Sequence, residues 1–255
     1  MDIIQDFYDS MAPHYDKLFF DWRASVGEQA AILDRLFRQN GYGRDAKILD
    51  CACGIGTQSI GSAALGYPVT ASDISAGALD EAKRRAAEAG VDIRFERADL
   101  RALGETFSEV FDIILCMDNA LPHMLSHDDL VAAVGSITDR LAQGGMFVAS
   151  IRDYDALLQE KPSYSPPYIH QTEKGRRVSF QTWDWDGELY RLVQYIIDDE
   201  EDLQIGKFRC IYRATRREEL TVLLKDHGCS EVVWYFPEQT GLYQPMVVAR
   251  KGGGL

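Results

Sequence analysis

The stretch Ile48–Ser59, ILDCACGIGTQS, is an apolar run that ends on an acidic residue and is followed at once by a G-x-G turn. This order is typical of a parallel strand that turns into a helix beside a bound ligand. The three-glycine dinucleotide fingerprint is incomplete, because Ser59 stands where its third glycine is expected. The turn therefore indicates an α/β fold with a ligand site, and it weakens a nicotinamide or flavin interpretation.

Composition narrows the class of protein. The 255 residues are 46% hydrophobic, which is enough to bury a full core. A formal net charge of −13 leaves no basic face for nucleic acid, so a small-molecule partner is favoured. The cysteines are scattered without a C-x-x-C pair, which argues against a disulfide framework or a zinc site. Because the N-terminus is acidic and no apolar stretch approaches the roughly 20 residues that span a bilayer, we expect a cytoplasmic protein without a membrane partner.

The first part of the chain has the pattern of a parallel sheet covered by helices. Helical and strand patterns alternate from Arg23 to about Ile151. The first helix is expected to start at Ser25, with Glu28 completing a capping box, and to end at Gly41. Further helices are expected to end at residues 66 and 90 and to span 128–142, and strands are expected at 47–50, 69–73, 93–96, 111–117 and 146–151.

The pattern changes after residue 151. Pro162, Pro166 and Pro167 predict a loop, and the Asp186-Gly187 pair is a strong hairpin signal between strand-like segments. We therefore expect an antiparallel β insert after the fifth strand, with strands at 178–185, 189–197 and 205–212. A last helix with a capping box at 215–218, two strands at 232–236 and 246–250, and a flexible tail at 252–255 are expected to follow.

This pattern divides the chain into four parts. They are an aromatic N-terminal lid segment at 1–24, an α/β core at 25–155, an antiparallel insert on the substrate side at 156–213, and a C-terminal part at 214–255 that completes the core.

Three acidic residues end consecutive strands. Asp50, Asp73 and Asp99 are expected to face one crevice, where open α/β sheets bind ligands. Asp73 follows Asp50 at the spacing expected of an acid that accepts hydrogen bonds from ribose hydroxyls. A purely structural interpretation is also open: Gly54 and Gly56 could only permit positive φ in the turn, and the two later acids could cap a helix and a turn.

Four motifs in order, LDCACGIGTQS, ASDIS, RADL and FDIILCMDNALPHM, resemble the class I S-adenosylmethionine-dependent methyltransferases. The resemblance implies a Rossmann-like sheet with a seventh, antiparallel strand. It implies that S-adenosylmethionine is bound and S-adenosylhomocysteine is the product, with the ribose on Asp73 and the adenine amine at Asp99. The residues that it assigns to the cofactor are Tyr8, Tyr15, Trp22, Arg23, Asp50, Ala52, Gly54, Gly56, Asp73, Ile74, Asp99, Leu100, Met117 and His123.

Further motifs are similar to one group within that family. MDNALPHML and SIRDYDALL resemble the GNSFAHL and HRNYD patterns of glycine N-methyltransferase and its bacterial glycine and sarcosine relatives, and GKFRCIY has a counterpart there. In this group the Asn and the Arg bind the substrate, which puts these roles on Asn119 and Arg152. The chain departs from the group at Asp118, where Gly stands, at Pro122, where Ala stands, and at Ile151, where His stands. The implied activity is methyl transfer to the amino nitrogen of a small carboxylate-bearing molecule, although not necessarily to glycine itself.

Methyl transfer from a sulfonium requires alignment more than acid–base groups. The acceptor carboxylate needs a fixed cation, and Arg152 offers a planar bidentate fork. Asn119 is expected to accept from the amine through its amide oxygen. A surface ion pair of Arg152 with Asp153 or Asp155, and a turn role for Asn119, are the structural interpretations of the same residues.

The N-terminal segment is rich in aromatic residues, which exclude water and favour a sulfonium cation. Tyr8 and Tyr15 resemble the paired tyrosines that cover the cofactor in methyltransferases, and Arg23 or a neighbour would hold the cofactor carboxylate. An ordinary docking helix would also explain the aromatic residues. We expect Tyr15 and Tyr212 to join Asn119 and Arg152 at the catalytic centre, with the Tyr212 hydroxyl near the amine.

His123 and His127, beside Asp128 and Asp129, have metal-ligand spacing, but Pro122 and the expected helix start favour a turn, and no metal is expected.

Magnesium on Asp118, Asn119 and Asp153, as in catechol-type O-methyltransferases, is disfavoured because Arg152 would compete for the same space. Two more functions are compatible with the motifs, namely a small-molecule O- or C-methyltransferase and a non-catalytic S-adenosylmethionine-binding regulator. The sequence leaves open the acceptor, the number of methyl groups transferred and the oligomeric state, including a homo-oligomer.

Overall fold

A computed structural model describes residues 3–172, 175–199 and 203–252, and its main element is a seven-stranded sheet. The strand order is β10-β11-β5-β4-β1-β2-β3. Strands β1 to β5 are parallel, whereas β11 is antiparallel to both β5 and β10. The predicted Rossmann-like sheet is confirmed. The strands are β1 Ile48–Asp50, β2 Val69–Asp73, β3 Arg94–Arg97, β4 Phe111–Cys116, β5 Leu141–Ser150, β10 Cys229–Tyr235 and β11 Met246–Lys251.

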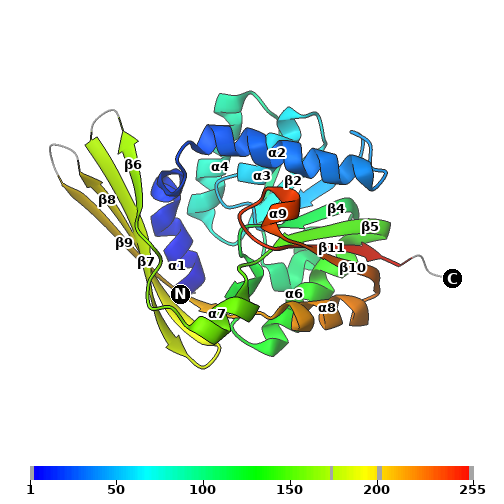
Figure 1. Ribbon diagram of the computed structural model, residues 1–255. Helices are drawn as coiled ribbons and strands as arrows, with labels where there is room; N and C mark the ends of the chain where they lie inside the picture. Colours follow the sequence, from blue (N-terminus) through cyan, green and yellow to red (C-terminus); the bar gives the residue numbers. More distant parts are fainter. Residues whose placement is uncertain (1–2, 173–174, 200–202, 253–255) are drawn as a thin grey trace.

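Helices cover both faces of this sheet (Figure 1). Because successive side chains of a strand point to opposite faces, the buried Ile48 and Leu49 of β1 belong to two separate cores. The first core packs against α2, α3 and α4, and the second packs against α5, α6 and α8. The helices are α2 Trp22–Gln39, α3 Thr57–Ala64, α4 Ala76–Ala89, α5 Leu103–Thr106, α6 His127–Arg140 and α8 Arg217–Asp226, and the short α9 Pro237–Thr240 precedes β11.

An antiparallel sheet follows β5, as predicted. After α7 (Tyr154–Glu160) come β6 (Tyr168–Thr172), β7 (Gly175–Asp186), β8 (Leu189–Asp199) and β9 (Gln204–Arg213), in the order β6-β7-β8-β9. The predicted hairpin is confirmed, since Asp186 pairs with Leu189 across Gly187 at φ +63°. Strand β6 was not predicted, because two prolines directly before Tyr168 give that stretch the character of a loop.

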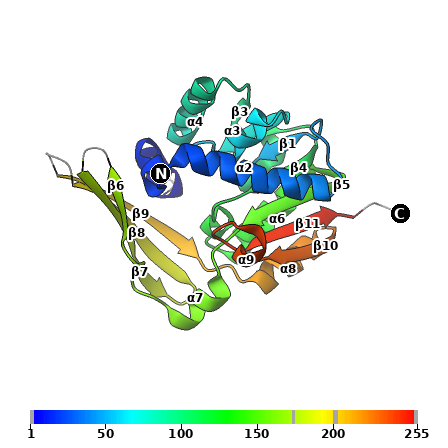
Figure 2. The ribbon, with the colours of Figure 1, turned by 45° about the horizontal axis from the view of Figure 1, so that its top comes forward.

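The N-terminal segment is helical and lies between the two sheets (Figure 2). It consists of α1 (Ile3–Met11) and the 3₁₀ helix η1 (Ala12–Leu18). Phe7 and Met11 of α1 pack with Tyr154 and with Trp183 and Tyr190 of the insert in a third core. The insert therefore rests on the N-terminal helices.

Three predicted element starts were wrong. Helix α2 begins at Trp22, because the side chain of Asp21 accepts from the Ala24 N–H at 3.0 Å, which moves the cap ahead of Ser25. Helix α8 begins at Arg217 without a side-chain cap. Strand β5 begins at Leu141, where it pairs with Phe111 before the glycine pair that was expected to form the turn.

The predicted tail beyond Gly252 lies outside the described residues. No described helix is both long and apolar enough to cross a membrane.

Candidate active site

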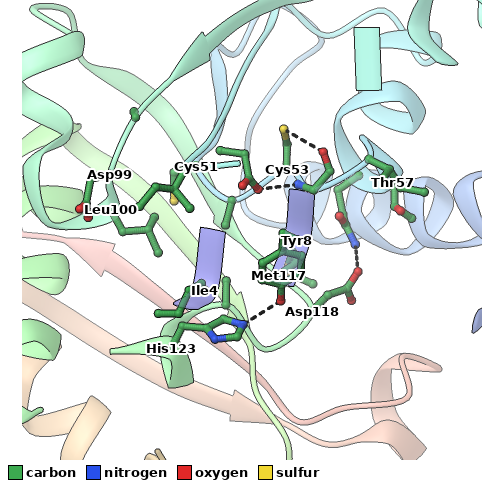
Figure 3. A pocket seen from close by; sticks show the side chains of 18 of the residues that line it. Ile4, Tyr8, Cys51, Cys53, Thr57, Asp99, Leu100, Met117, Asp118 and His123 are labelled. Carbon is green, nitrogen blue, oxygen red and sulfur yellow. Dashed lines mark hydrogen bonds between the residues drawn. The ribbon is translucent and has the colours of Figure 1, made fainter. Parts of the chain in front are cut away.

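A cavity lies at the carboxyl ends of the parallel strands, where β1, β2, β3 and β4 turn into the following segments. We call it the strand-end cavity (Figure 3). Ile4 and Tyr8 of α1 and Tyr15 of η1 complete its wall. Most of the residues predicted to bind the cofactor line it, namely Tyr8, Tyr15, Ala52, Gly54, Asp73, Ile74, Asp99, Leu100, Met117 and His123.

The turn after β1 holds the Asp73 carboxylate through the backbone. The N–H of Gly54 donates to Asp73 Oδ2 at 2.8 Å, and the N–H of Ser75 donates to Oδ1 at 2.9 Å. Burial raises the pKa of Asp73, and these two hydrogen bonds oppose that rise. Each oxygen keeps one lone pair for another donor. Gly54 has φ +52°, and no heavy atom lies within 4 Å of where a Cβ would stand, so the backbone of the turn is open.

Asp50 and Gly56 support the turn from behind and are not among the residues that line the cavity. Asp50 is fully buried, accepts from Ser59 Oγ at 2.5 Å, and has its pKa raised by burial to about 7. A Cβ on Gly56 would stand 2.9 Å from Ile60 Cδ1, so helix α3 packs closely against the turn. Both residues thus support the turn, and their predicted contact with the cofactor stays a prediction.

Trp22 and Arg23 are also not among the residues that line the two cavities. Trp22 Nε1 donates to Thr57 Oγ1 at 3.0 Å, and Arg85 covers its ring at 4.3 Å. The Arg23 side chain is 82% exposed and lies 3.7 Å from Glu88. Because α2 begins at Trp22, the buried Trp22 takes the inward face and Arg23 takes the solvent face. Thr57 lines the strand-end cavity in their place.

Asp99 has both its predicted position and its structural role as a cap. It lines the cavity, and its side chain accepts from the Arg101 N–H at 2.9 Å at the start of a short 3₁₀ helix. Arg101 Nη2 also pairs with it at 2.7 Å, and Arg101 reaches Asp129 at 2.9 Å. Although burial acts to raise it, the hydrogen bonds from Arg101 hold the pKa of Asp99 below its usual value.

His123 is a buried neutral group beside Tyr8. Burial lowers its pKa to about 3, and its Nε2 lies 2.7 Å from the hydroxyl of Tyr8. The hydroxyl donates, because burial raises the pKa of Tyr8 well above its ordinary value. His127 is separate, since it lies 2.9 Å from Glu219 on the surface. Across the described residues, no group of three or more His, Cys, Asp or Glu side chains could hold a metal ion.

A second cavity lies between the N-terminal helices and the insert, and we call it the insert cavity. Tyr8, Tyr15 and Asp118 line both cavities, so the two spaces meet at these residues. The other polar residues of the insert cavity include Asn119, Arg152, Gln181, Gln194, Tyr212 and Tyr243.

Arg152 is fixed in this cavity by neutral partners. Its Nη2 donates to Gln181 Oε1 at 3.0 Å, and its Nη1 donates to the Tyr190 hydroxyl at 3.2 Å. Its guanidinium lies 5.0 Å from the Trp183 ring and 5.5 Å from the Tyr212 ring. It forms no salt bridge with any residue that the structure describes. An arginine held in this way has donors to offer to an anionic ligand.

The surface ion pair that the sequence left open for Arg152 is wrong. Asp153 lies 2.5 Å and Asp155 lies 3.2 Å from Arg217, so both acids pair with Arg217 and not with Arg152.

The amide oxygen of Asn119 is used within the protein, which corrects its predicted role as an acceptor from the amine. The oxygen accepts from the Arg152 N–H at 3.1 Å and from the Tyr154 hydroxyl at 3.0 Å. A backbone N–H can only donate, so it is the oxygen that faces Arg152. The buried Nδ2 has no hydrogen-bond partner among the described residues. Asn119 also has φ +70°, directly after Asp118 at φ +56°.

Tyr212 lies at the insert cavity, and its predicted role at the catalytic centre stays a prediction. It is buried and lines the insert cavity, with its ring 4.2 Å from His123 and 5.4 Å from Tyr190. Sequence reasoning missed the insert residues Gln181 and Trp183 beside Arg152, although their period-two spacing marks one face of a strand. It also missed Thr57 and Gln58, although both lie inside the motif after β1, and it missed three residues outside any motif, namely Tyr190, Gln194 and Tyr243.

Known proteins resemble this chain in sequence and in fold. Residues 48–145 match a family model described as a methyltransferase domain. A glycine/sarcosine N-methyltransferase of Aphanothece halophytica is 24% identical over 94% of this chain and 85% of that protein. One of Parasynechococcus marenigrum is 28% identical over 61% of this chain, and that match spans 54% of the relative's length.

Solved structures share the whole arrangement. An S-adenosylmethionine-dependent methyltransferase from Clostridium acetobutylicum has a TM-score of 0.77 at 20% identity, over 96% of this chain and 99% of its own. An S-adenosylmethionine-bound amino pentose methyltransferase from Micromonospora echinaspora has a TM-score of 0.72 at 20% identity, over 89% and 92%. Residues 48–145 therefore match a methyltransferase domain, and the chain as a whole shares the fold of these S-adenosylmethionine-dependent methyltransferases.

Proposed function

We propose that this methyltransferase transfers a methyl group to the amino nitrogen of a small carboxylate-bearing molecule of the glycine or sarcosine type. Arg152 carries the proposal, because its guanidinium lies in the insert cavity with neutral partners and without an acidic one among the described residues. A carboxylate is the ligand that such a fork fits best. The relatives named as glycine/sarcosine N-methyltransferases support the same substrate class.

The strand-end cavity fits S-adenosylmethionine. When bound, the cofactor supplies an electrophilic methyl group on a sulfonium. Asp73 has lone pairs for the ribose hydroxyls, and the open backbone at Gly54 lets the amino acid end approach the turn. Ile74 and Leu100 offer apolar walls to the base. Tyr8 and Tyr15 lie at the junction of the cavities, where their aromatic rings would stand beside the sulfonium cation of the cofactor.

The chain's own residues would align the acceptor. Arg152 grips the carboxylate, and the free Nδ2 of Asn119 donates to an oxygen of the same molecule. The buried ring of Tyr212 closes the far wall and excludes water. The barrier falls mainly because the nucleophile is held in line with the methyl carbon, which requires position and not a charged catalyst.

The test is a labelled methyl donor offered to amino acids, amino sugars and phenols, with and without EDTA. We expect amino acids to accept the label regardless of the chelator. Arg152→Ala should raise the KM for the acceptor and leave donor affinity nearly intact. Arg191 is an exposed arginine on β8, and Arg191→Ala should change neither quantity. Labelling of phenols alone, of amino sugars alone, or only with a divalent metal would overturn the proposal.

A further inference from the structure

Asp118 stands where the two cavities meet. Of the described residues that line both cavities, namely Tyr8, Tyr15 and Asp118, only Asp118 carries a charge. Its Oδ2 accepts from Gln58 Nε2 at 2.9 Å (Figure 3), and its Oδ1 accepts from the Tyr243 hydroxyl at 3.0 Å. Each oxygen keeps a lone pair, and the carboxylate forms no salt bridge with a described residue. It is therefore a fixed anion with acceptor capacity at the place where an acceptor would meet the donor.

The backbone holds this carboxylate in an unfavourable conformation. Asp118 has φ +56° and Asn119 has φ +70°, a region that costs most L residues about 1–2 kcal/mol each. The N–H of Asp118 donates to Ser150 Oγ at 2.8 Å and that of Asn119 donates to the Ser150 carbonyl at 3.0 Å, which fixes the turn to β5. Glycine would avoid the strain. Strain of this kind is commonly stored at functional sites.

Apart from Asp73, which we assign to the ribose, the other titratable groups around the junction are poor proton acceptors. Burial, with the charge of Asp118 adding to it, raises the pKa of Tyr15 from η1 and of Tyr243 from the segment before β11, so both hydroxyls stay protonated. The Nε2 of His123 already accepts from Tyr8, and burial keeps the pKa of this imidazole near 3. Arg152 stays cationic, and Asp50 is buried behind the turn. Burial also raises the pKa of Asp118 itself, which favours its taking a proton.

We propose that Asp118 binds the ammonium group of the acceptor and takes one of its protons before methyl transfer. The inference rests on the proposed amine acceptor. An N–H bond breaks and leaves its electron pair on nitrogen, while the proton moves to a carboxylate oxygen and gives a neutral carboxyl. The nitrogen pair then forms the bond to the methyl carbon, and the pair of the broken C–S bond stays on sulfur. Together, Arg152 and Asp118 offer opposite charges to the two ends of a zwitterion.

Two variants separate the effect of the negative charge of Asp118 from the effect of the size of its side chain. Asp118→Asn keeps the size and tolerates positive φ, and Asp118→Gly relieves the strain and removes the side chain. Asp112→Asn, on β4 and outside both cavities, is the control. At saturating donor and pH 7, we expect kcat/KM for the amino acid to fall on the order of 100-fold in both variants. The loss should shrink as the pH approaches the pKa of the free amine, because the amine then arrives deprotonated.

Calorimetry provides a readout other than activity. With S-adenosylhomocysteine bound, both variants should bind the amino acid more weakly than the native chain does, yet bind the matching carboxylic acid without its amine equally well. If kcat/KM fell by the same factor at every pH, or did not fall, the role of Asp118 would be overturned. The proposed function would still stand, provided that the native chain transferred label to amino acids. If no amino acid accepted label in the native chain, the proposed function itself would fail.

Discussion

Asp73 shows how one side chain can be fixed by the backbone and still be available to a ligand. Two backbone N–H groups orient its carboxylate, one from the β1 turn and one from the start of α4. An amide cannot replace it, because its NH₂ would face an N–H that can only donate. The residue therefore couples the geometry of the turn to the proposed ribose contact.

We expect Asp73→Asn to weaken binding of S-adenosylhomocysteine about 10- to 100-fold, since hydrogen bonds to a charged group contribute about 1.5–3 kcal/mol. Titration calorimetry measures the change, and Asp80→Asn, on the exposed side of α4, is the control. An unchanged dissociation constant for Asp73→Asn would rule out its contact with the ligand.

The positions of side chains at the ends of strands could be predicted from the sequence. Positions that depend on where a helix starts, or on a hydrogen-bond partner far away in the sequence, could not. Asp73 and Leu100 follow strands, and both line the strand-end cavity. Arg23 was misplaced because the cap of α2 lies at Asp21, which turns Arg23 to solvent. The orientation of Asn119 depends on the N–H of Arg152, and this contact forms only when β4 and β5 pair.

Helices α2 and α3 approach each other at Gly61. A Cβ there would stand 2.7 Å from Ala30 Cβ and 2.8 Å from the Val26 carbonyl oxygen. Gly61 lies in α3, whereas Gly27 lies in α2. Gly27 is exposed, and a Cβ there would meet nothing within 4 Å. The two glycines thus serve different purposes within one pair of helices.

We expect Gly61→Ala to lower the free energy of unfolding by about 1–3 kcal/mol, because the helices must move apart. Gly27→Ala should raise it by up to about 1 kcal/mol, since alanine is the better helix former. Urea unfolding of both variants provides the comparison. Equal effects of the two substitutions would show that the close contact at Gly61 does not matter.

Helix α1 is fastened to the start of α4 by Asp9. Its Oδ1 accepts from Ser75 Oγ at 2.5 Å and from the Gly77 N–H at 2.9 Å. Although burial acts to raise it, these bonds lower the pKa of Asp9 below its ordinary value. The unfolded chain therefore takes up this proton first as the pH falls. The stabilisation from Asp9 is complete above the unfolded pKa of about 3.9 and is lost as the pH falls through the folded one.

We expect Asp9→Ala to destabilise the chain at pH 7, and the difference from the native chain to shrink as the pH falls below about 4. Asp6→Ala, an exposed acid on the same helix, should show little effect. Chemical unfolding across pH 3–7 measures both. If the difference in unfolding free energy between Asp9→Ala and the native chain did not change with pH, the stabilisation would not come from an ionised Asp9.

The regular elements of the core could be predicted, because their apolar periods and glycine stops are local. Strand β6 could not, since it pairs only with β7 along one edge and its apolar residues Tyr168 and Ile169 are exposed. The two capping boxes were wrong for a related reason. Asp21 caps α2 ahead of Ser25, and α8 begins at Arg217 without a side-chain cap.

Across the whole chain, the site is assembled from segments far apart in sequence. The N-terminal helices, the turns after β1, β2 and β4, the insert and the segment before β11 all contribute to the two cavities. Most residues of the strand-end cavity could be predicted, because they stand at the ends of successive strands. Those of the insert cavity could not, since the contact of Gln181 with Arg152 depends on how the insert packs on the core.

The central claim is that Arg152 holds the carboxylate of an amine acceptor. The most direct measurement compares an amino acid with its uncharged carboxamide as methyl acceptors at saturating donor, in the native chain and in Arg152→Gln. Because an unpaired buried charge costs about 2–5 kcal/mol, we expect the native chain to prefer the amino acid on the order of 100-fold in kcat/KM. The preference should fall below about tenfold in the variant. Equal use of the two acceptors by the native chain, or an undiminished preference in Arg152→Gln, would contradict the claim.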